Sequence, residues 1–148
     1  MPTVVPMTDP RPPAPGLADG RPGGPAGTGT TEITDTVDGL RLAVTTGDDD
    51  VVVIAVDGEL DILTAPELRA AVTDRIPSAA LIVLALDGVL FLGTSGLAAL
   101  IEIREQAHRA GVELRLACTE RRVLRPLGIA GLHHLFDIHD DVEAALNS

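Results

Sequence analysis

The sequence predicts an α/β (α+β) fold in which helices cross over a mixed sheet, and three observations support this. Two apolar runs, 51–56 and 81–86, have the length of buried strands. Each run is followed by a turn-forming segment and then by a stretch with helical periodicity. A third segment, 40–45, alternates apolar with polar or small residues just before the first run. Strands separated by helices after an opening hairpin require crossover connections.

The opening hairpin has a half-exposed first strand and a more deeply buried second one. Leu40, Leu42 and Val44 recur with the period of two that is typical of a strand with one exposed face. The segment 47–50, a glycine and three aspartates, turns the chain. The unbroken apolar run 51–56 then predicts a central strand covered on at least one face.

The first helix is predicted to begin at Ala65. Thr64-Ala65-Pro66-Glu67 has the form of a capping box, in which the Thr64 hydroxyl and the Glu67 carboxylate bond to free backbone amides. Pro66 is tolerated in the first turn. Pro77 then stops the helix before the strand 81–86.

The second strand-loop-helix unit repeats this order. Gly88 and Gly93 bracket its predicted loop, and the helix runs from about Thr94 until Gly111 ends it. Four further elements are expected: a strand over 113–117, a helix capped by Thr119 that Pro126 shortens or kinks, a short strand over 136–138, and a last helix capped by Asp140 or Asp141.

Composition divides the chain into a disordered tail, 1–31, and one domain, 32–148. Eight of the eleven prolines lie in the tail, which is too poor in apolar residues to offset the cost of ordering. The net charge of -11 and the 1% aromatic content argue against binding to nucleic acid or anionic lipid. No apolar run approaches the roughly 20 residues that span a bilayer. With a single cysteine, Cys118, and no secretory signal pattern, the sequence predicts a cytoplasmic protein.

The segment Gly93-Thr94-Ser95-Gly96 places Ser95 in the first turn of a helix, with its hydroxyl exposed. The free amides and the positive end of the helix dipole favour a phosphate there. Such a phosphate would block a partner that has to bury the hydroxyl. The alternative is that Thr94 and Ser95 are ordinary helix-cap residues. A nucleophile elbow is disfavoured, because it needs glycine two residues after the serine, where this chain has Leu97.

The segment from Gly58 to Thr64 follows the first buried strand in the same way. Parallel strands deliver their following loops to one edge of a sheet, so Asp61 and Ser95 become neighbours if the runs 51–56 and 81–86 pair. Glu59 and Asp61 are more often solvated or capping carboxylates than an acid-base pair. We expect no catalytic residue.

His133, His134 and His139, together with Asp137, suggest a metal site. Adjacent histidines diverge on regular backbone, and no zinc-ligand spacing is present, so no metal is expected. The aspartates 48–50 lack the ligand ladder of a calcium loop.

Two motifs in order, Gly58-Glu59-Leu60-Asp61 with Thr64-Ala65-Pro66, and Phe91-Leu92-Gly93-Thr94-Ser95-Gly96-Leu97, resemble the STAS domain of bacterial anti-sigma-factor antagonists. The likeness covers residues from about 38 to 147. It implies a mixed sheet of four to five strands with about four helices packed mainly on one side. It also implies that the protein is not an enzyme.

By this resemblance, the protein binds an anti-sigma factor that is also a serine kinase and so frees a sigma factor. The kinase would bind ATP and phosphorylate Ser95, with Thr94 in reserve, and a PP2C-type phosphatase would reverse the step; the chain itself would hold no cofactor. Family members usually carry Asp where this chain has Gly93. This chain therefore lacks the hydrogen-bond acceptor that the Asp carboxylate provides. The docking surface implied by the motifs comprises Gly58, Glu59, Asp61, Thr64, Gly93, Thr94, Ser95 and Gly96.

Two other functions compete with this one. The same fold could serve as a non-catalytic subunit of a stressosome-like or lipid-transport assembly. A small esterase that uses Ser95 is disfavoured, because no histidine is convincingly spaced as its base.

Overall fold

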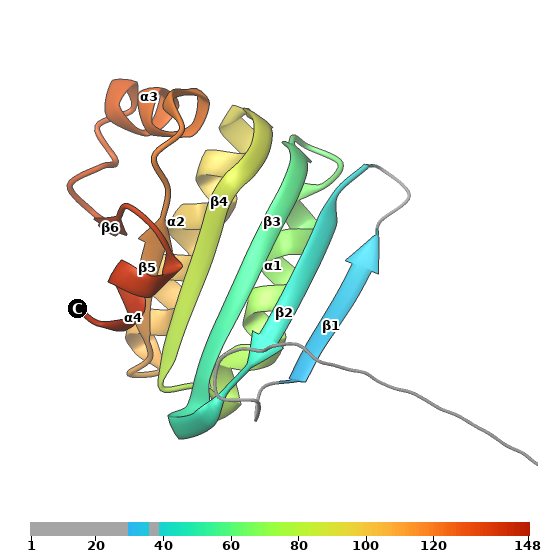
Figure 1. The fold of residues 1–148 in the computed structure, drawn as a ribbon. Coiled ribbons are helices and arrows are strands. Elements are labelled where there is room, and N and C mark those ends of the chain that lie inside the picture. The colour runs from blue at the N-terminus through green and yellow to red at the C-terminus, as the bar shows by residue number, and fades with distance from the viewer. Residues whose placement is uncertain (1–29, 36–38) are drawn as a thin grey trace, which may run out of the picture.

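The computed structural model describes residues 30–35 and 39–148; most of the predicted tail lies outside the described residues. In the described part, six strands form one sheet in the order β1-β2-β3-β4-β5-β6 (Figure 1). The first three strands pair antiparallel, and the later ones add in parallel. The strands are β1 (Thr30–Asp35), β2 (Arg41–Thr46), β3 (Val51–Leu60), β4 (Leu81–Leu92), β5 (Glu113–Ala117) and β6 (Asp137–His139).

The prediction of four to five strands is therefore too low. The additional strand, β1, begins at Thr30, so its first two residues belong to the predicted tail, 1–31. Its sequence is mostly polar, with Ile33 as its one large apolar side chain, so it carries no periodic signal. Pairing with β2 holds it as a strand, and such pairing is a tertiary effect.

The predicted loop between Gly88 and Gly93 is also wrong, because β4 continues as a strand to Leu92. The extension pairs with the end of β3, with register shifts that flank Asp57 and Gly58. A Cβ on Gly88 would collide with the Asp57 carboxylate. Gly88 thus permits the close approach of two strands.

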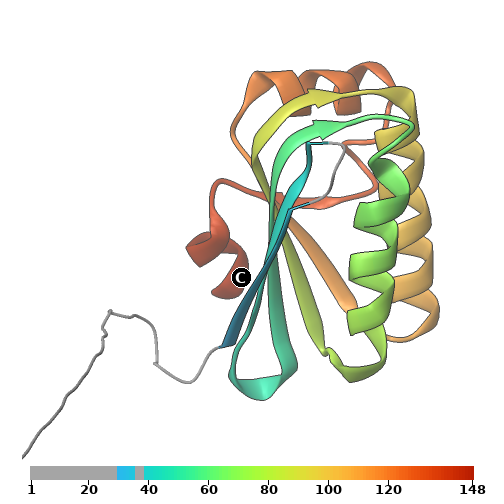
Figure 2. The same cartoon turned by 90° about the vertical axis from the view of Figure 1, so that its right-hand side faces the viewer.

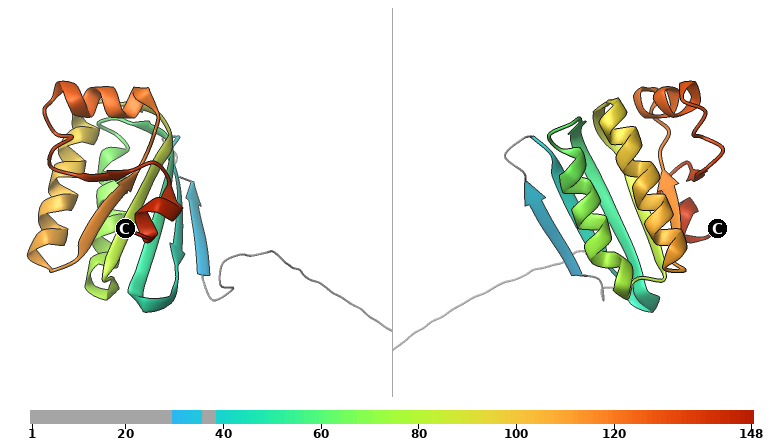
Figure 3. Two further views of the ribbon diagram at one scale, coloured as in Figure 1. Left: turned by 60° about the vertical axis from the view of Figure 1, so that its left-hand side comes forward. Right: turned by 180° about the vertical axis from the view of Figure 1, so that it is seen from behind.

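The helices divide between the faces of the sheet. The α-helices of the described residues are α1 (Ala65–Arg75), α2 (Thr94–Arg109), α3 (Arg121–Ile129) and α4 (Val142–Leu146). Figure 2 shows α1 and α2 on one face and α4 on the opposite one, and Figure 3 shows both faces in turn. α3 lies against the end of β4, where the Arg122 Nε donates to the Val89 carbonyl over 2.7 Å. The expected packing mainly on one side is confirmed, because α3 adds Val123 and Leu127 to the same core as α1 and α2, and only α4 lies on the opposite face.

The main core lies between the sheet and the helices α1 and α2. Alternate residues of β3 and β4, such as Ile54 and Leu84, meet Leu68 of α1 and Leu100 of α2. All four side chains are fully buried. Among the helices in the described residues, none is long and apolar enough to cross a membrane.

The helix caps differ from the predicted ones. Within the described part, Thr64 makes no side-chain bond to the amides of α1, so the predicted capping box is wrong. Thr119 does not cap α3; instead, the Asp87 carboxylate of β4 accepts from the amides of Thr119 and Glu120 at 2.8 and 3.2 Å. Of the two candidates for α4, Asp141 is the cap, because its carboxylate accepts from the Ala144 amide at 2.7 Å.

Candidate partner-binding site

The ends of β3 and β4 bring the two predicted motif segments together. Glu59 is paired with Phe91, and Leu60 with Leu92, in parallel register. The Gly93 amide then donates to the Leu60 carbonyl over 2.9 Å, which ties the start of α2 to the end of β3. The predicted pairing of the two strands is confirmed, and the segments that follow them form one edge of the molecule.

The connection from β3 to α1 is held by Asp61 and Thr64. The Thr64 hydroxyl donates to the Glu59 carbonyl over 2.6 Å and accepts from the Asp61 amide at 2.9 Å. The Asp61 carboxylate accepts from the amides of Leu63 and Thr64 at 2.9 and 3.1 Å. The hydrogen bonds that the Asp61 carboxylate accepts hold the pKa of Asp61 below its ordinary value, and the bond from the Thr64 amide has the largest effect. Thr64 is fully buried, so its hydrogen bonds fix the connection from the side that faces the core.

The glycines of the motifs serve close backbone contacts. Gly58 has a φ of +116°, and a Cβ there would collide with the Gly39 carbonyl. Gly96 is buried against β3 and β4: its added Cβ would stand 3.0 Å from the Leu60 Cβ and 2.7 Å from the Leu92 Cδ1. Gly58 and Gly96 therefore set the backbone path that presents the neighbouring side chains.

The first turn of α2 presents Thr94 and Ser95 to solvent. Thr94 is exposed and Ser95 half-buried. The Leu97 amide donates to the Gly93 carbonyl over 3.0 Å, whereas the amides of Thr94, Ser95 and Gly96 find no acceptor among the described residues. The Phe91 ring lies beside Gly93, 3.0 Å from where a Cβ would stand.

An exposed apolar group stands at this edge, in or beside the two motif segments. It comprises Ile62 and Leu63 before α1, exposed by 75% and 62%, and Leu90 and Phe91 at the end of β4, exposed by 62% and 52%. We call these four residues the apolar rim. One signal in the sequence points to it: pairs of large apolar residues stand beside both motifs without the period of a buried element. Such groupings on a surface mark binding sites.

Two carboxylates stand at this edge of the molecule. Glu59 is exposed, and Asp61 is engaged by backbone amides. His108 lies in the last turn of α2, about 20 Å of helix away from Ser95. His133 and His134, expected to diverge, have ring centroids only 3.9 Å apart. The part of the chain that the structure describes holds no group of three or more potential metal ligands.

Comparisons with known proteins agree with this architecture. A family model described as STAS domain matches residues 43–145. The anti-sigma-F factor antagonist RsfA of Mycobacterium tuberculosis is 28% identical over 103 residues, which cover 68% of this chain and 80% of that protein. A crystal structure of an anti-sigma factor antagonist from Mycobacterium paratuberculosis has a TM-score of 0.68 at 28% identity and covers 77% of this chain and 97% of its own.

A third similarity concerns the fold alone. The Bacillus cell fate determinant SpoIIAA, solved in its phosphorylated form, has a TM-score of 0.55 at 17% identity and covers 80% of this chain and 98% of its own. The family model spans well over half of the chain. The chain belongs to the STAS domain family.

Proposed function

We propose that the protein is an anti-sigma-factor antagonist, which binds an anti-sigma factor through the edge around Ser95 and thereby releases a sigma factor. The observation that carries the proposal is the apolar rim, Ile62, Leu63, Leu90 and Phe91, which is exposed at the edge where the half-buried Ser95 stands in the first turn of α2. Large exposed aliphatic and aromatic side chains around a small polar centre provide the desolvated anchors that dominate protein interfaces.

The energy of docking would come from the rim. Burial of apolar surface contributes about 25 cal/mol per Å². The rim side chains are already more than half exposed, so their burial by a partner would cost little reorganisation. Asp61 and Thr64 position the rim residues Ile62 and Leu63, because their hydrogen bonds fix the connection that carries these two residues.

The switch would be phosphorylation of Ser95. The unpaired amides at the start of α2 can donate hydrogen bonds to a phosphate without loss of structure. Nearly two negative charges among the rim residues would have to be desolvated on docking, which opposes binding. Thr94, the more exposed hydroxyl, is the reserve acceptor.

Gly93 bears on how a kinase would recognise this site. With glycine there, the start of α2 lacks the acidic side chain that the resemblance leads us to expect, and the Phe91 ring lies beside the backbone instead. We propose that recognition relies on the rim more than on a local charge. ATP belongs to the partner kinase, a PP2C-type phosphatase restores the free serine, and the chain acts in the cytoplasm as a regulator without catalytic activity.

The test combines binding with phosphate mapping. The full chain is incubated with ATP and each anti-sigma kinase encoded by the same genome, and the modified residue is located by mass spectrometry. We expect phosphate on Ser95 and at least about 100-fold weaker binding by Ser95→Asp, or some 2.7 kcal/mol. Ser78→Asp is the matched control, since Ser78 is exposed beyond the other end of α1. Its binding should stay within threefold of the wild type.

Two outcomes would overturn different parts of the proposal. Phosphate on neither Ser95 nor Thr94 with a kinase that binds the chain would remove the switch. Unchanged binding by a Leu90→Ser, Phe91→Ser variant would remove the docking surface, because these exposed side chains contribute little to the core.

A further inference from the structure

The segment that begins with α3 is positively charged on an acidic protein. Residues 121–136 include three arginines and no Asp or Glu, whereas the whole chain has 22 acidic residues and a net charge of -11. The chain contains no lysine, so its 11 basic residues are all arginines. A guanidinium group can bind a carboxylate through two parallel hydrogen bonds, which an ammonium group cannot do. The segment is therefore suited to an acidic ligand.

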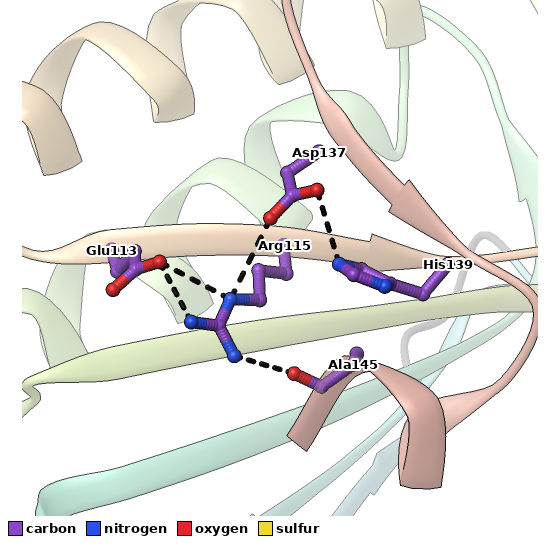
Figure 4. A network of polar contacts seen from close by, with 5 residues as sticks. All are labelled: Glu113, Arg115, Asp137, His139 and Ala145. Carbon is purple, nitrogen blue, oxygen red and sulfur yellow. Dashed lines mark hydrogen bonds and ion pairs between the residues drawn. The ribbon is translucent and has the colours of Figure 1, made fainter. Parts of the chain in front are cut away.

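Two of these arginines have no partner among the described residues. Arg121 and Arg125 are exposed, and their side chains make no ion pair or hydrogen bond within that part of the chain. Arg115 of β5 is different, because its guanidinium lies 2.7 Å from the Glu113 carboxylate and donates to the Ala145 carbonyl over 2.6 Å (Figure 4). Arg115 holds elements of the fold together, whereas Arg121 and Arg125 are available to bind another molecule.

The two free arginines of α3 point away from the core. Residues four apart in a helix lie on the same face, so Arg121 and Arg125 are neighbours. Val123 and Leu127, which are fully buried, occupy the opposite face of the helix. Ile129, one further turn along on the arginine side, is 80% exposed. The outer face of α3 thus presents two guanidinium groups followed by an apolar side chain.

Hydrogen bonds in both directions fix α3 to the end of β4. The Arg122 Nε donates to the Val89 carbonyl over 2.7 Å, and the Asp87 carboxylate accepts from the Thr119 amide at 2.8 Å. Val89 directly precedes Leu90 of the apolar rim. Figures 1 and 2 show α3 at the same end of the molecule as the ends of β3 and β4. The outer face of α3 therefore lies next to the rim.

We propose that α3 is a second docking element for the anti-sigma factor, in which Arg121 and Arg125 bind carboxylates that the partner carries. The inference rests on the proposed function and adds the chemistry of the partner surface. That surface would place two acidic side chains about 6 Å apart, the distance that four residues span along a helix, and an apolar side chain against Ile129. Charge pairs at the border of an interface fix its orientation and accelerate association.

The charge of the rest of the chain favours an acidic protein surface over nucleic acid. Affinity for nucleic acid requires basic side chains that neutralise many phosphates, and α3 offers two free ones on a chain with a net charge of -11. A long polyanion would also extend over the acidic surface around α3 and be repelled there. A folded partner can instead present its carboxylates to the two guanidinium groups alone.

Charge reversal tests the proposal with the anti-sigma factor that binds the wild-type chain in the test of the proposed function. We expect Arg121→Glu and Arg125→Glu each to weaken binding at least about tenfold in 0.1 M NaCl, measured by titration calorimetry, because attraction becomes repulsion. Arg109→Glu is the matched control, since Arg109 is exposed at the other end of α2. Its binding should stay within about threefold of wild type. The urea midpoints of all three variants should match that of wild type.

The absence of lysine permits a direct test of what Arg125 contacts. Arg125→Lys introduces the one side-chain amine of the chain. A carbodiimide joins this amine to a carboxylate in contact with it as an amide, and the reagent takes up the water that is lost. We expect mass spectrometry to find position 125 linked to an Asp or Glu of the anti-sigma factor. The control Arg109→Lys should give no such link.

Several results would overturn the inference without touching the proposed function. They are unchanged binding by Arg121→Glu and Arg125→Glu, an equal loss by Arg109→Glu, and no link from position 125, each with phosphate still found on Ser95. A short DNA duplex that binds the wild type but neither reversal variant would assign the arginines to nucleic acid instead. If no anti-sigma factor binds the wild-type chain, the proposed function fails and this inference fails with it.

Discussion

Gly96 of α2 rests directly on Leu60 of β3. A Cβ added to Gly96 would stand 3.0 Å from the Leu60 Cβ and 3.1 Å from the Leu60 carbonyl oxygen. The Gly93 amide bonds to that same carbonyl over 2.9 Å. The start of α2, with Thr94 and Ser95, is thus fixed against the strand that leads into the other motif, so the geometry of the edge depends on a missing side chain.

Gly96→Ala should destabilise the protein by about 1 to 3 kcal/mol, because the added methyl group forces backbone or side-chain shifts in a packed core. The matched control is Gly128→Ala in α3, where the Cβ would meet only the His133 Nδ1 at an ordinary 3.9 Å. Better helix propensity should make that variant up to about 1 kcal/mol more stable. Urea denaturation measures both. Equal stabilisation of the two variants would contradict the close contact with Leu60.

Thr64→Val should cost about 1 to 3 kcal/mol, since the Glu59 carbonyl and the Asp61 amide both lose the buried hydroxyl that satisfies them. Thr64→Ser keeps the hydroxyl and should lose clearly less. Denaturant unfolding gives the two free energies. A valine variant as stable as the serine variant would show that these bonds contribute nothing.

Asp61 should contribute to the acid sensitivity of the fold. Its pKa is lowered, first by the bond from the Thr64 amide, so its stabilisation is complete above the unfolded pKa of about 3.9 and is lost as pH falls through the folded pKa. Asp61→Asn should therefore lose less stability than wild type between pH 4.5 and pH 2.5 in urea titrations. Asp74→Asn, which removes an exposed carboxylate on α1, is the control. Parallel pH profiles for wild type and Asp61→Asn would refute the assignment.

Cys118 should be unreactive in the folded protein. Burial raises its pKa to about 12, with the nearby Asp87 carboxylate adding to the effect, so at pH 8 only about one molecule in ten thousand carries the thiolate. Modification by a chromogenic disulfide reagent should be at least about 1000-fold slower in the native state than in guanidinium. Ser78→Cys supplies an exposed thiol that reacts within seconds. Native Cys118 reacting at that rate would exclude the buried environment.

Much of the fold was predictable from local pattern. The runs 51–56 and 81–86 are strands, α1 begins at Ala65, and α2 ends just before Gly111, which has a φ of +75°. Apolar periodicity and glycine preferences act within a few residues of one another, so these elements could be derived from neighbouring positions. The motifs also identified Ser95 and Asp61 as members of one edge.

What escaped prediction depends on partners distant in sequence. β1 exists because it pairs with β2, and Gly88 lies inside a strand because Asp57 of the neighbouring strand approaches it. The buried Thr64 hydroxyl bonds to the Glu59 carbonyl, which removes it from the predicted capping box. A capping pattern cannot reveal which acceptor a hydroxyl will meet once the chain is packed.

The sequence by itself determined the order of the main strands and helices, the acidic character of the chain and the two motifs, because each arises from local propensity or composition. Only the tertiary structure decided that Ile62, Leu63, Leu90 and Phe91 are exposed at the edge that carries Ser95, and that α4 packs on the sheet face opposite α1 and α2. Exposure is a property of the packed chain, since a large apolar residue reads the same in sequence whether the fold buries it or presents it.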